Sequence, residues 1–204
     1  MKKRKPKPNL SVSLRELAED PVSWFERAAV EPVAVRDSEG DEPNLVMISE
    51  AEWREMIAPY LALIPDDHPL VRVHEEVQQQ TRCWHGTGLY LPGGFRVLDP
   101  TTRLHVAAFR AAVLQTLYDM SLPQMHDEAT YNIIYRWFIG EEYLLAHLPS
   151  VQEFEALSAD LQKEPSICRQ LVEAVGHGGR EDPQGDVFFI SHTRLAFWAE
   201  RAAA

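Results

Sequence analysis

The sequence predicts an α+β protein in which a small strand–helix–hairpin–helix domain is followed by a mostly α-helical domain. Three observations lead to this prediction. Two β-rich runs flank an acidic, glycine-containing loop in the first quarter of the chain. A break with two prolines follows at 65–69, and beyond residue 103 apolar residues recur at helical spacing. A chain of 204 residues is long enough for two domains of this kind.

The start of the first domain, expected over 10–64, is a short strand that runs directly into a helix. Residues 1–9 are rich in Lys and Pro and are expected to form a basic, flexible arm. The strand is predicted at 10–13, and Ser13 is suited to cap the following helix. Glu16 stands three residues later, which completes the pattern of a capping box.

The rest of the first domain is predicted as a divided helix, a hairpin and a second helix. Pro21 is expected to split the first helix, which runs to about residue 29. The runs 32–36 and 44–48 are expected to pair as an antiparallel hairpin with a long loop. Ser49 then begins a helix to about residue 64, whose acidic first turn suits the positive end of the helix dipole.

The second domain, expected over 67–180, is predicted to contain a series of helices and one Gly- and Pro-rich loop. A small hairpin is expected in that loop around 92–94, and a C-terminal extension is expected over 181–204, with a strand at 186–190. The run His177-Gly-Gly179 is expected to end the preceding helix. The expected helices are 70–83, 103–120 with Thr102 as its cap, 121–132, a helix from Ser150, 166–175, and a final helix from Thr193.

An aromatic segment at 131–140 is the most distinctive part of this second domain. Its apolar residues Tyr131, Ile134, Trp137 and Phe138 are spaced to bury one face of a helix, with Arg136 pointing elsewhere. A packed helix with one amphipathic Arg is the favoured interpretation, ahead of a binding hot spot.

The charge of the chain is distributed unevenly. The formal net charge is −11, yet the first seven residues carry five positive charges, so the remainder sums to −16. An acidic body binds nucleic acid poorly, whereas the short basic arm can supply several phosphate contacts. No apolar run is long enough for a membrane span, and no secretory signal is recognised. Two isolated cysteines fit a reduced, cytoplasmic protein.

No set of residues in the sequence predicts catalysis, a metal site or a cofactor. The eight histidines are scattered without zinc spacing, and no glycine run has the context of a phosphate loop. An enzyme is therefore not expected. Arg103 and Arg110 stand seven apart on one helix face, where they can contact DNA or a partner, or pair with Glu141 or Glu142.

The first domain resembles the Phd/YefM-type antitoxins. The resemblance rests on Ser11-Val-Ser-Leu-Arg-Glu-Leu17, on Glu31-Pro-Val-Ala-Val-Arg36, and on Asn44-Leu-Val-Met-Ile-Ser-Glu-Ala-Glu-Trp-Arg54. It covers about 9–64 and implies a small α+β domain that forms a homodimer, binds palindromic operator DNA and represses its own operon. The loop at 37–42 is acidic, where that family is often basic or neutral. A whole domain also stands in place of the segment that wraps around the toxin.

The second domain resembles the N-terminal helical domain of DDE-class insertion-sequence transposases. The matching stretches are 103–118 and Tyr131-Asn-Ile-Ile-Tyr-Arg-Trp-Phe-Ile-Gly140, within about 67–179. The resemblance implies a module for DNA-end binding and subunit contacts. The catalytic core of those enzymes is not expected, because only 25 residues follow Gly179.

The favoured hypothesis is a non-catalytic, homodimeric DNA-binding transcriptional regulator of antitoxin type. The alternative is an antitoxin or adaptor whose acidic helical domain binds and neutralises a partner protein, such as a toxin. The residues expected to contact DNA are Lys2, Lys3, Arg4, Lys5, Lys7, Arg15 and Arg36, and those expected to contact DNA or a partner are Arg103, Arg110 and Arg136.

Overall fold

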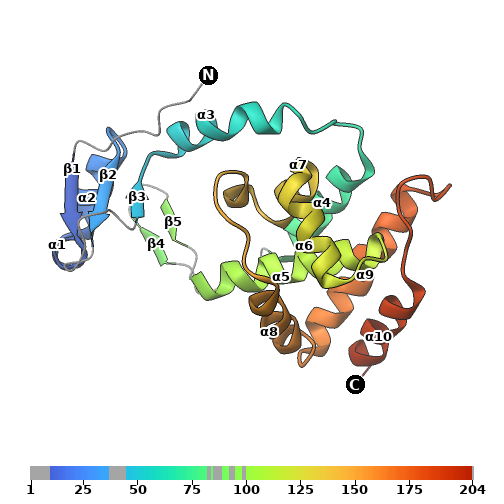
Figure 1. Cartoon of the computed structure of the whole chain (residues 1–204). Coiled ribbons are helices and arrows are strands. Elements are labelled where there is room, and N and C mark those ends of the chain that lie inside the picture. The colour runs from blue at the N-terminus through green and yellow to red at the C-terminus, as the bar shows by residue number, and fades with distance from the viewer. Residues whose placement is uncertain are drawn as a thin grey trace. The chain divides into compact units, whose positions relative to one another are not determined.

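The computed structural model describes residues 10–36, 45–81, 84, 89–91, 95–97 and 100–203. It is mainly helical with a small sheet, which agrees at this level with the α+β prediction (Figure 1). The chain divides into two compact units, which are described separately below. One comprises 1–59 with 90–95, and the other comprises 60–89 with 96–204. Residues 181–204, expected as an extension, cluster with the second unit.

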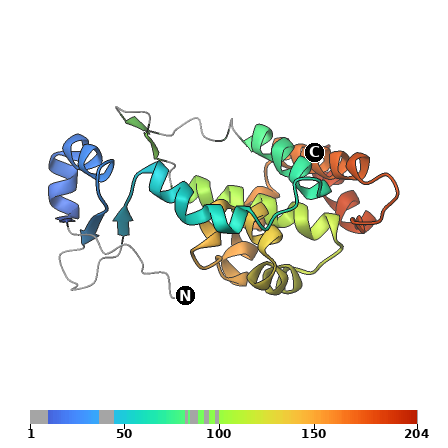
Figure 2. The same cartoon turned by 90° about the horizontal axis from the view of Figure 1, so that it is seen from above.

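The first unit is built on a three-stranded sheet of mixed direction. Strands β1 (Leu10–Ser13) and β2 (Val33–Arg36) are parallel, and β2 pairs antiparallel with β3 (Leu45–Met47). The β2–β3 pairing is the predicted hairpin. The parallel pairing is joined by α1 (Leu14–Glu19) and α2 (Pro21–Ala28), which pack on the strands (Figure 2).

Helix caps explain why the chain changes from strand to helix at Ser13 and begins a second helix after Asp20. Ser13 and Glu16 form the predicted capping box, with a Glu16 N–H to Ser13 Oγ distance of 3.2 Å. Asp20 then accepts from Ser23 N–H and begins α2, with Pro21 at its first position. The helices cover a small core of Val12, Ala28, Val33 and Val35.

Helix α3 (Glu50–Leu61) follows β3 and begins as the sequence predicts. Ser49 and Glu52 form reciprocal hydrogen bonds, with 3.2 Å between Glu52 N and Ser49 Oγ. The helix includes Pro59 and ends three residues before the expected end at residue 64.

The second unit consists mainly of helices. A two-stranded sheet forms where the small hairpin is predicted, and its residues 90–95 cluster with the first unit. The turn at 92–94 lies outside the described residues. The elements of this part of the chain are α4 (Pro69–Thr81), β4 (Leu89–Leu91), β5 (Phe95–Val97), α5 (Pro100–Leu117), α6 (Leu122–Tyr131), α7 (Ile133–Ile139), the 3₁₀ helix η2 (Glu141–Leu144), α8 (Val151–Leu161), α9 (Pro165–Glu181) and α10 (His192–Ala202).

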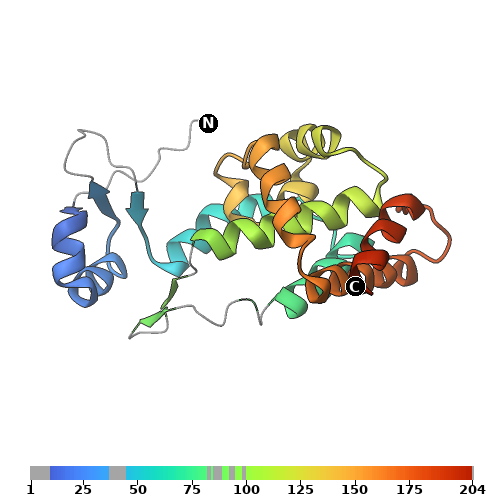
Figure 3. The same ribbon diagram turned by 90° about the horizontal axis from the view of Figure 1, so that it is seen from below.

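Helix α5 is the central element of this unit, as its apolar sequence predicts. Phe109, Val113, Leu114 and Leu117 are fully buried. Helices α6, α7, α8 and α9 all pack against α5, while α9 also packs against α4 and α10 (Figure 3). The close approach of α9 depends on Gly178, since a Cβ there would lie 2.6 Å from Leu117 Cδ2.

Four expectations for this unit are wrong. Thr102 does not cap the long helix, because α5 already begins at Pro100 and Thr102 lies inside it. Tyr131 is 89% exposed, because α6 ends there and Asn132 caps a new helix, so Tyr131 does not share a face with Trp137. The Gly178-Gly179 pair does not end its helix, because α9 continues to Glu181. Residues 186–190 form an irregular segment, not a strand, since the backbone N–H groups of 186–188 bond to the Asp182 side chain instead of a neighbouring strand.

Candidate functional site

Two of the residues expected to contact DNA lie near one end of the small sheet. Ser13 pairs with Arg36 across the parallel strands, and Arg15 follows Ser13 in the first turn of α1. The expected basic arm, with Lys2, Lys3, Arg4, Lys5 and Lys7, lies outside the described residues. It precedes Leu10, which pairs with Val33 at the other end of the strands. Three residue steps separate the two ends, about 10 Å.

The side chain of Arg15 can exchange its present partner, Glu19, for another anion. Its Nε lies 3.1 Å from Glu19 Oε1, and the two side chains are 88% and 63% exposed. An exposed i,i+4 pair of this kind contributes about 0.3–0.5 kcal/mol. Arg36 is half-buried at the end of β2. Together they bring two cations from distant parts of the sequence to one end of the sheet.

The three arginines expected to contact DNA or a partner in the helical unit have different environments. Arg103 is exposed near the start of α5. Burial lowers the pKa of Arg110, while the nearby carboxylates of Glu142 and Glu141 favour its charged form. Pairing of Arg110 with these glutamates is one of the alternatives that the sequence leaves open. Arg136 donates from Nη2 to Ala146 O at 3.0 Å, and its Nε is buried without a hydrogen-bond partner.

The interior beside Arg110 also contains a histidine. Burial, with a smaller contribution from the Arg110 charge, lowers the pKa of His74 to about 3, so the ring is neutral at pH 7. It packs against Trp137 with ring centroids 4.1 Å apart. This cluster fixes α4 against α7 and gives no open site, so Arg110 takes no part in the contacts that we propose below.

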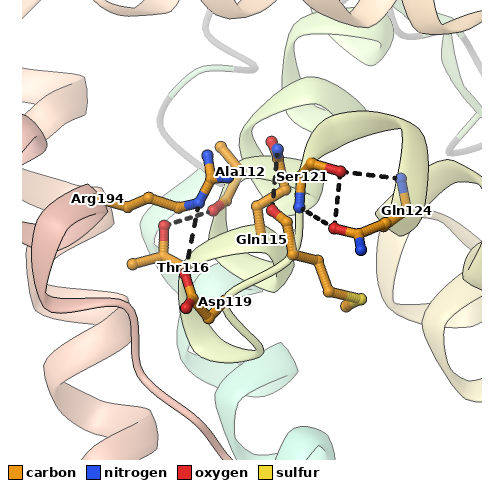
Figure 4. A network of polar contacts seen from close by, with 8 residues as sticks. Ala112, Gln115, Thr116, Asp119, Ser121, Gln124 and Arg194 are labelled. Carbon is orange, nitrogen blue, oxygen red and sulfur yellow. Dashed lines mark hydrogen bonds and ion pairs between the residues drawn. The ribbon is translucent and has the colours of Figure 1, made fainter.

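An open groove of about 900 Å³ lies elsewhere in the helical unit, between the end of α5, the start of α6, one face of α8 and the start of α10. Figure 4 shows part of its polar lining, with Arg194 reaching from α10 towards Asp119 at the end of α5. Glu155 and Gln162 line it from α8, and Phe197 adds an apolar surface from α10. The sequence alone assigns no function to these residues.

The start of α10 presents unpaired donors to this groove. Ser191 is only 7% exposed, and its N–H donates to Thr116 O at 2.8 Å, which fixes the helix start against α5. Its hydroxyl makes no hydrogen bond within the described residues, and α10 has no side-chain cap. Because the first intrahelical bond is donated by Leu195 N, the N–H groups of residues 192–194 also have no helical partner.

The end of α5 presents the opposite charge. Asp119 has a φ of 49°, a left-handed conformation that is uncommon outside glycine, and Met120 N donates to Gln115 O at 3.0 Å around it. A carboxylate here lies at the negative end of the helix dipole. Arg194 Nε lies 4.0 Å from Asp119 Oδ1 and partly compensates that charge.

A turn held by Asp182 leads the chain from α9 to this groove. Its carboxylate accepts from the N–H groups of Asp186, Val187 and Phe188 at 3.1, 2.9 and 2.6 Å. Desolvation raises the pKa of Asp182, but these bonds outweigh it and the pKa is lowered. Phe188, which is 4% exposed, then packs on Tyr118 three residues before Ser191.

The groove was missed from the sequence because its parts come from four separate helices. The only local signal is that Ser191 immediately precedes a helix, which makes it a candidate cap. Nothing in the pattern indicates that Thr116 O would bond its N–H, or that Arg194 would lie beside Asp119.

Within the described residues, no three His, Cys, Asp or Glu side chains are grouped so that they can hold a metal ion. None of the helices that the structure describes is both long and apolar enough to cross a membrane. In comparisons with known proteins, the chain matches no family model, no curated protein and no solved structure.

Proposed function

We propose that the protein is a non-catalytic, homodimeric DNA-binding transcriptional regulator of antitoxin type. In this proposal the first unit is a Phd/YefM-like domain, and the helical unit is a transposase-derived module without the catalytic core. The observation that supports it most is the parallel register of β1 and β2, which pairs Ser13 with Arg36 and brings Arg15 near the same end of the sheet. The strand–helix–hairpin–helix order agrees with the antitoxin resemblance.

The proposed interface combines weak contacts and gains affinity through symmetry. Arg15 exchanges Glu19 for a DNA phosphate at little cost, since the exposed ion pair contributes only about 0.3–0.5 kcal/mol. The arm residues Lys2, Lys3, Arg4, Lys5 and Lys7 supply further phosphate contacts. A homodimer presents two such sets to a palindromic site, so the second set binds at high effective concentration.

The test is fluorescence anisotropy with a fragment of the protein's own promoter over a series of salt concentrations. The slope of log K against log salt should fall by about 0.9 for each phosphate contact removed. Arg15→Ala should therefore weaken binding and lower the slope by about 0.9, with a larger effect after substitution of the five arm residues. Arg54→Ala is the matched control, because Arg54 forms an equivalent exposed i,i+4 pair with Glu50 on α3.

Equal slopes for Arg15→Ala and Arg54→Ala, together with no effect of the arm substitutions, would refute the proposed interface. A monomer by light scattering at the concentrations that bind DNA would refute the symmetric form.

A second candidate function is an adaptor that binds and neutralises a partner protein through its helical unit. The exposure of Tyr131 favours it, because an 89% exposed tyrosine on α6 is the kind of residue that contributes to protein interfaces. Co-purification from the native operon distinguishes the two functions. A stoichiometric partner lost in Tyr131→Ala supports the adaptor, whereas its absence with intact DNA binding supports the regulator alone.

A further inference from the structure

The groove between α5, α6, α8 and α10 contains two opposite charged regions a short distance apart. The first consists of the Ser191 hydroxyl, the N–H groups of residues 192–194 and the guanidinium of Arg194. The second consists of the Asp119 carboxylate and the C-terminal end of α5. Arg194 Nε and Asp119 Oδ1, which lie 4.0 Å apart, mark the boundary between them (Figure 4).

The first region is suited to a carboxylate. Helix N-termini bind anions through their unpaired N–H groups and the positive end of the dipole. Here a second observation supports an anion, because Ser191 is 93% buried, lines the groove and leaves its hydroxyl without a hydrogen bond. This hydroxyl is therefore able to donate a hydrogen bond to a carboxylate bound in the groove.

The second region is suited to an ammonium group. Asp119 is 63% exposed at its side chain and points a carboxylate towards the groove from the negative end of α5. Glu155 adds another exposed carboxylate to the lining. These acidic groups disfavour a phosphate dianion, so the ligand should carry both a positive charge and a single negative charge.

We propose that this groove binds a free α-amino acid with a large apolar side chain. Its carboxylate bonds to Ser191 Oγ, to the N–H groups at the start of α10 and to Arg194, and its ammonium group bonds to Asp119. Both charges are attached to one carbon, which matches the short separation of Arg194 and Asp119. The volume of about 900 Å³ leaves room for a large side chain against Ile190 and Phe197.

The proposal does not depend on DNA binding, because every residue in it belongs to the helical unit. The two proposals therefore fail independently: calorimetry with amino acids tests this one, and anisotropy with DNA tests the other.

The test is isothermal titration calorimetry of the full chain with L-phenylalanine and L-leucine at up to about 10 mM, which detects even a millimolar Kd. N-acetyl-L-phenylalanine lacks the ammonium group, and L-phenylalaninamide lacks the carboxylate. Each should bind about tenfold or more weakly than the free amino acid, because each loses charge-assisted hydrogen bonds. Glycine, which keeps both charges without the side chain, should also bind more weakly.

Variants identify the site. Asp119→Asn keeps a residue that tolerates the left-handed conformation, and it should weaken phenylalanine binding about tenfold while leaving binding of the N-acetyl derivative unchanged. Ser191→Ala and Arg194→Gln should weaken the free amino acid but not the amide. Glu200→Gln is the control, since Glu200 is an exposed carboxylate on α10 that does not line the groove.

Absence of heat with both amino acids, in a protein whose circular dichroism shows it folded, overturns the proposal. It is also overturned if the acetylated or amidated ligand binds as tightly as the free amino acid, or if Asp119→Asn and Arg194→Gln bind like Glu200→Gln.

Discussion

Asp182 allows a sharp test of how a single side chain fixes the segment before α10. Three backbone N–H groups bond to its carboxylate at 2.6, 2.9 and 3.1 Å. Hydrogen bonds to charged groups contribute about 1.5–3 kcal/mol each when well protected. This carboxylate is partly exposed and solvent screens it, so we expect about 2–3 kcal/mol for Asp182→Ala in total. At about 2–4 °C per kcal/mol in a chain of this size, the Tm should fall by roughly 4–12 °C.

Asp182→Asn should be milder. One amide oxygen can still accept from Val187 and Phe188, both of which bond to Oδ2, but the amide nitrogen would face the N–H of Asp186. We expect a loss of about 1–2 kcal/mol, measured by chemical denaturation at pH 7. Asp186→Asn is the matched control in the same turn and should change stability by less than about 0.5 kcal/mol.

The pH dependence provides a second readout of the same carboxylate. The Asp182 pKa lies below its ordinary value of 3.8, since bonds from backbone N–H groups outweigh the desolvation that raises it. Its stabilisation is therefore fully present above the unfolded-state pKa and is lost as the pH falls through the lower folded-state pKa. The difference between the wild type and Asp182→Asn should shrink in that window. Equal stabilities of Asp182→Asn and Asp186→Asn at pH 7 would refute the reasoning.

Three further predictions concern the helical unit. Gly178→Ala should destabilise it by about 1–3 kcal/mol in denaturant titrations, since the new Cβ would lie 2.6 Å from Leu117. Gly176→Ala, the control, should be neutral or stabilising. A greater loss of stability in Gly176→Ala than in Gly178→Ala would contradict this packing. The His74 pKa of about 3 means that the unfolded chain takes up one more proton below pH 6.5. Stability should therefore fall by up to about 1.4 kcal/mol per pH unit between pH 6.5 and 3, and an unchanged slope in His74→Gln would exclude this cause. Ser150→Ala removes the capping box of α8 and should lower stability by about 1 kcal/mol in the same titrations; no change would mean that the cap is dispensable.

The sequence predicts those parts of the fold that short-range chemistry determines. Ser13, Ser121 and Ser150 all begin helices in the predicted places, because a capping box is complete within four residues. Pro21 divides α1 from α2 for an equally local reason, since its ring suits a first helical position.

Predictions fail where a packing contact, a side-chain hydrogen bond or a helix cap overrides the pattern of apolar residues. Two glycines normally favour the end of a helix, yet α9 passes through Gly178 because the missing side chain lets it pack closely on Leu117. The β-forming residues 186–190 do not form a strand, because Asp182 takes up the backbone donors of 186–188. Tyr131 is exposed because the helical pattern is interrupted at Asn132, which the spacing of apolar residues alone does not reveal.

Local sequence patterns do not predict the groove either, because its residues come from separate helices. Two of these residues are also not explained by the stability of the fold. Asp119 has a backbone conformation that glycine adopts more easily, and it carries a negative charge at the unfavourable end of α5. Ser191 is a buried N-cap residue, but its hydroxyl accepts no hydrogen bond from the first turn of α10. Neither choice improves the stability of the helix to which it belongs. Both residues nevertheless line one groove, in which Arg194 Nε lies 4.0 Å from Asp119 Oδ1, and the proposed amino-acid ligand would give each of them a role that folding does not.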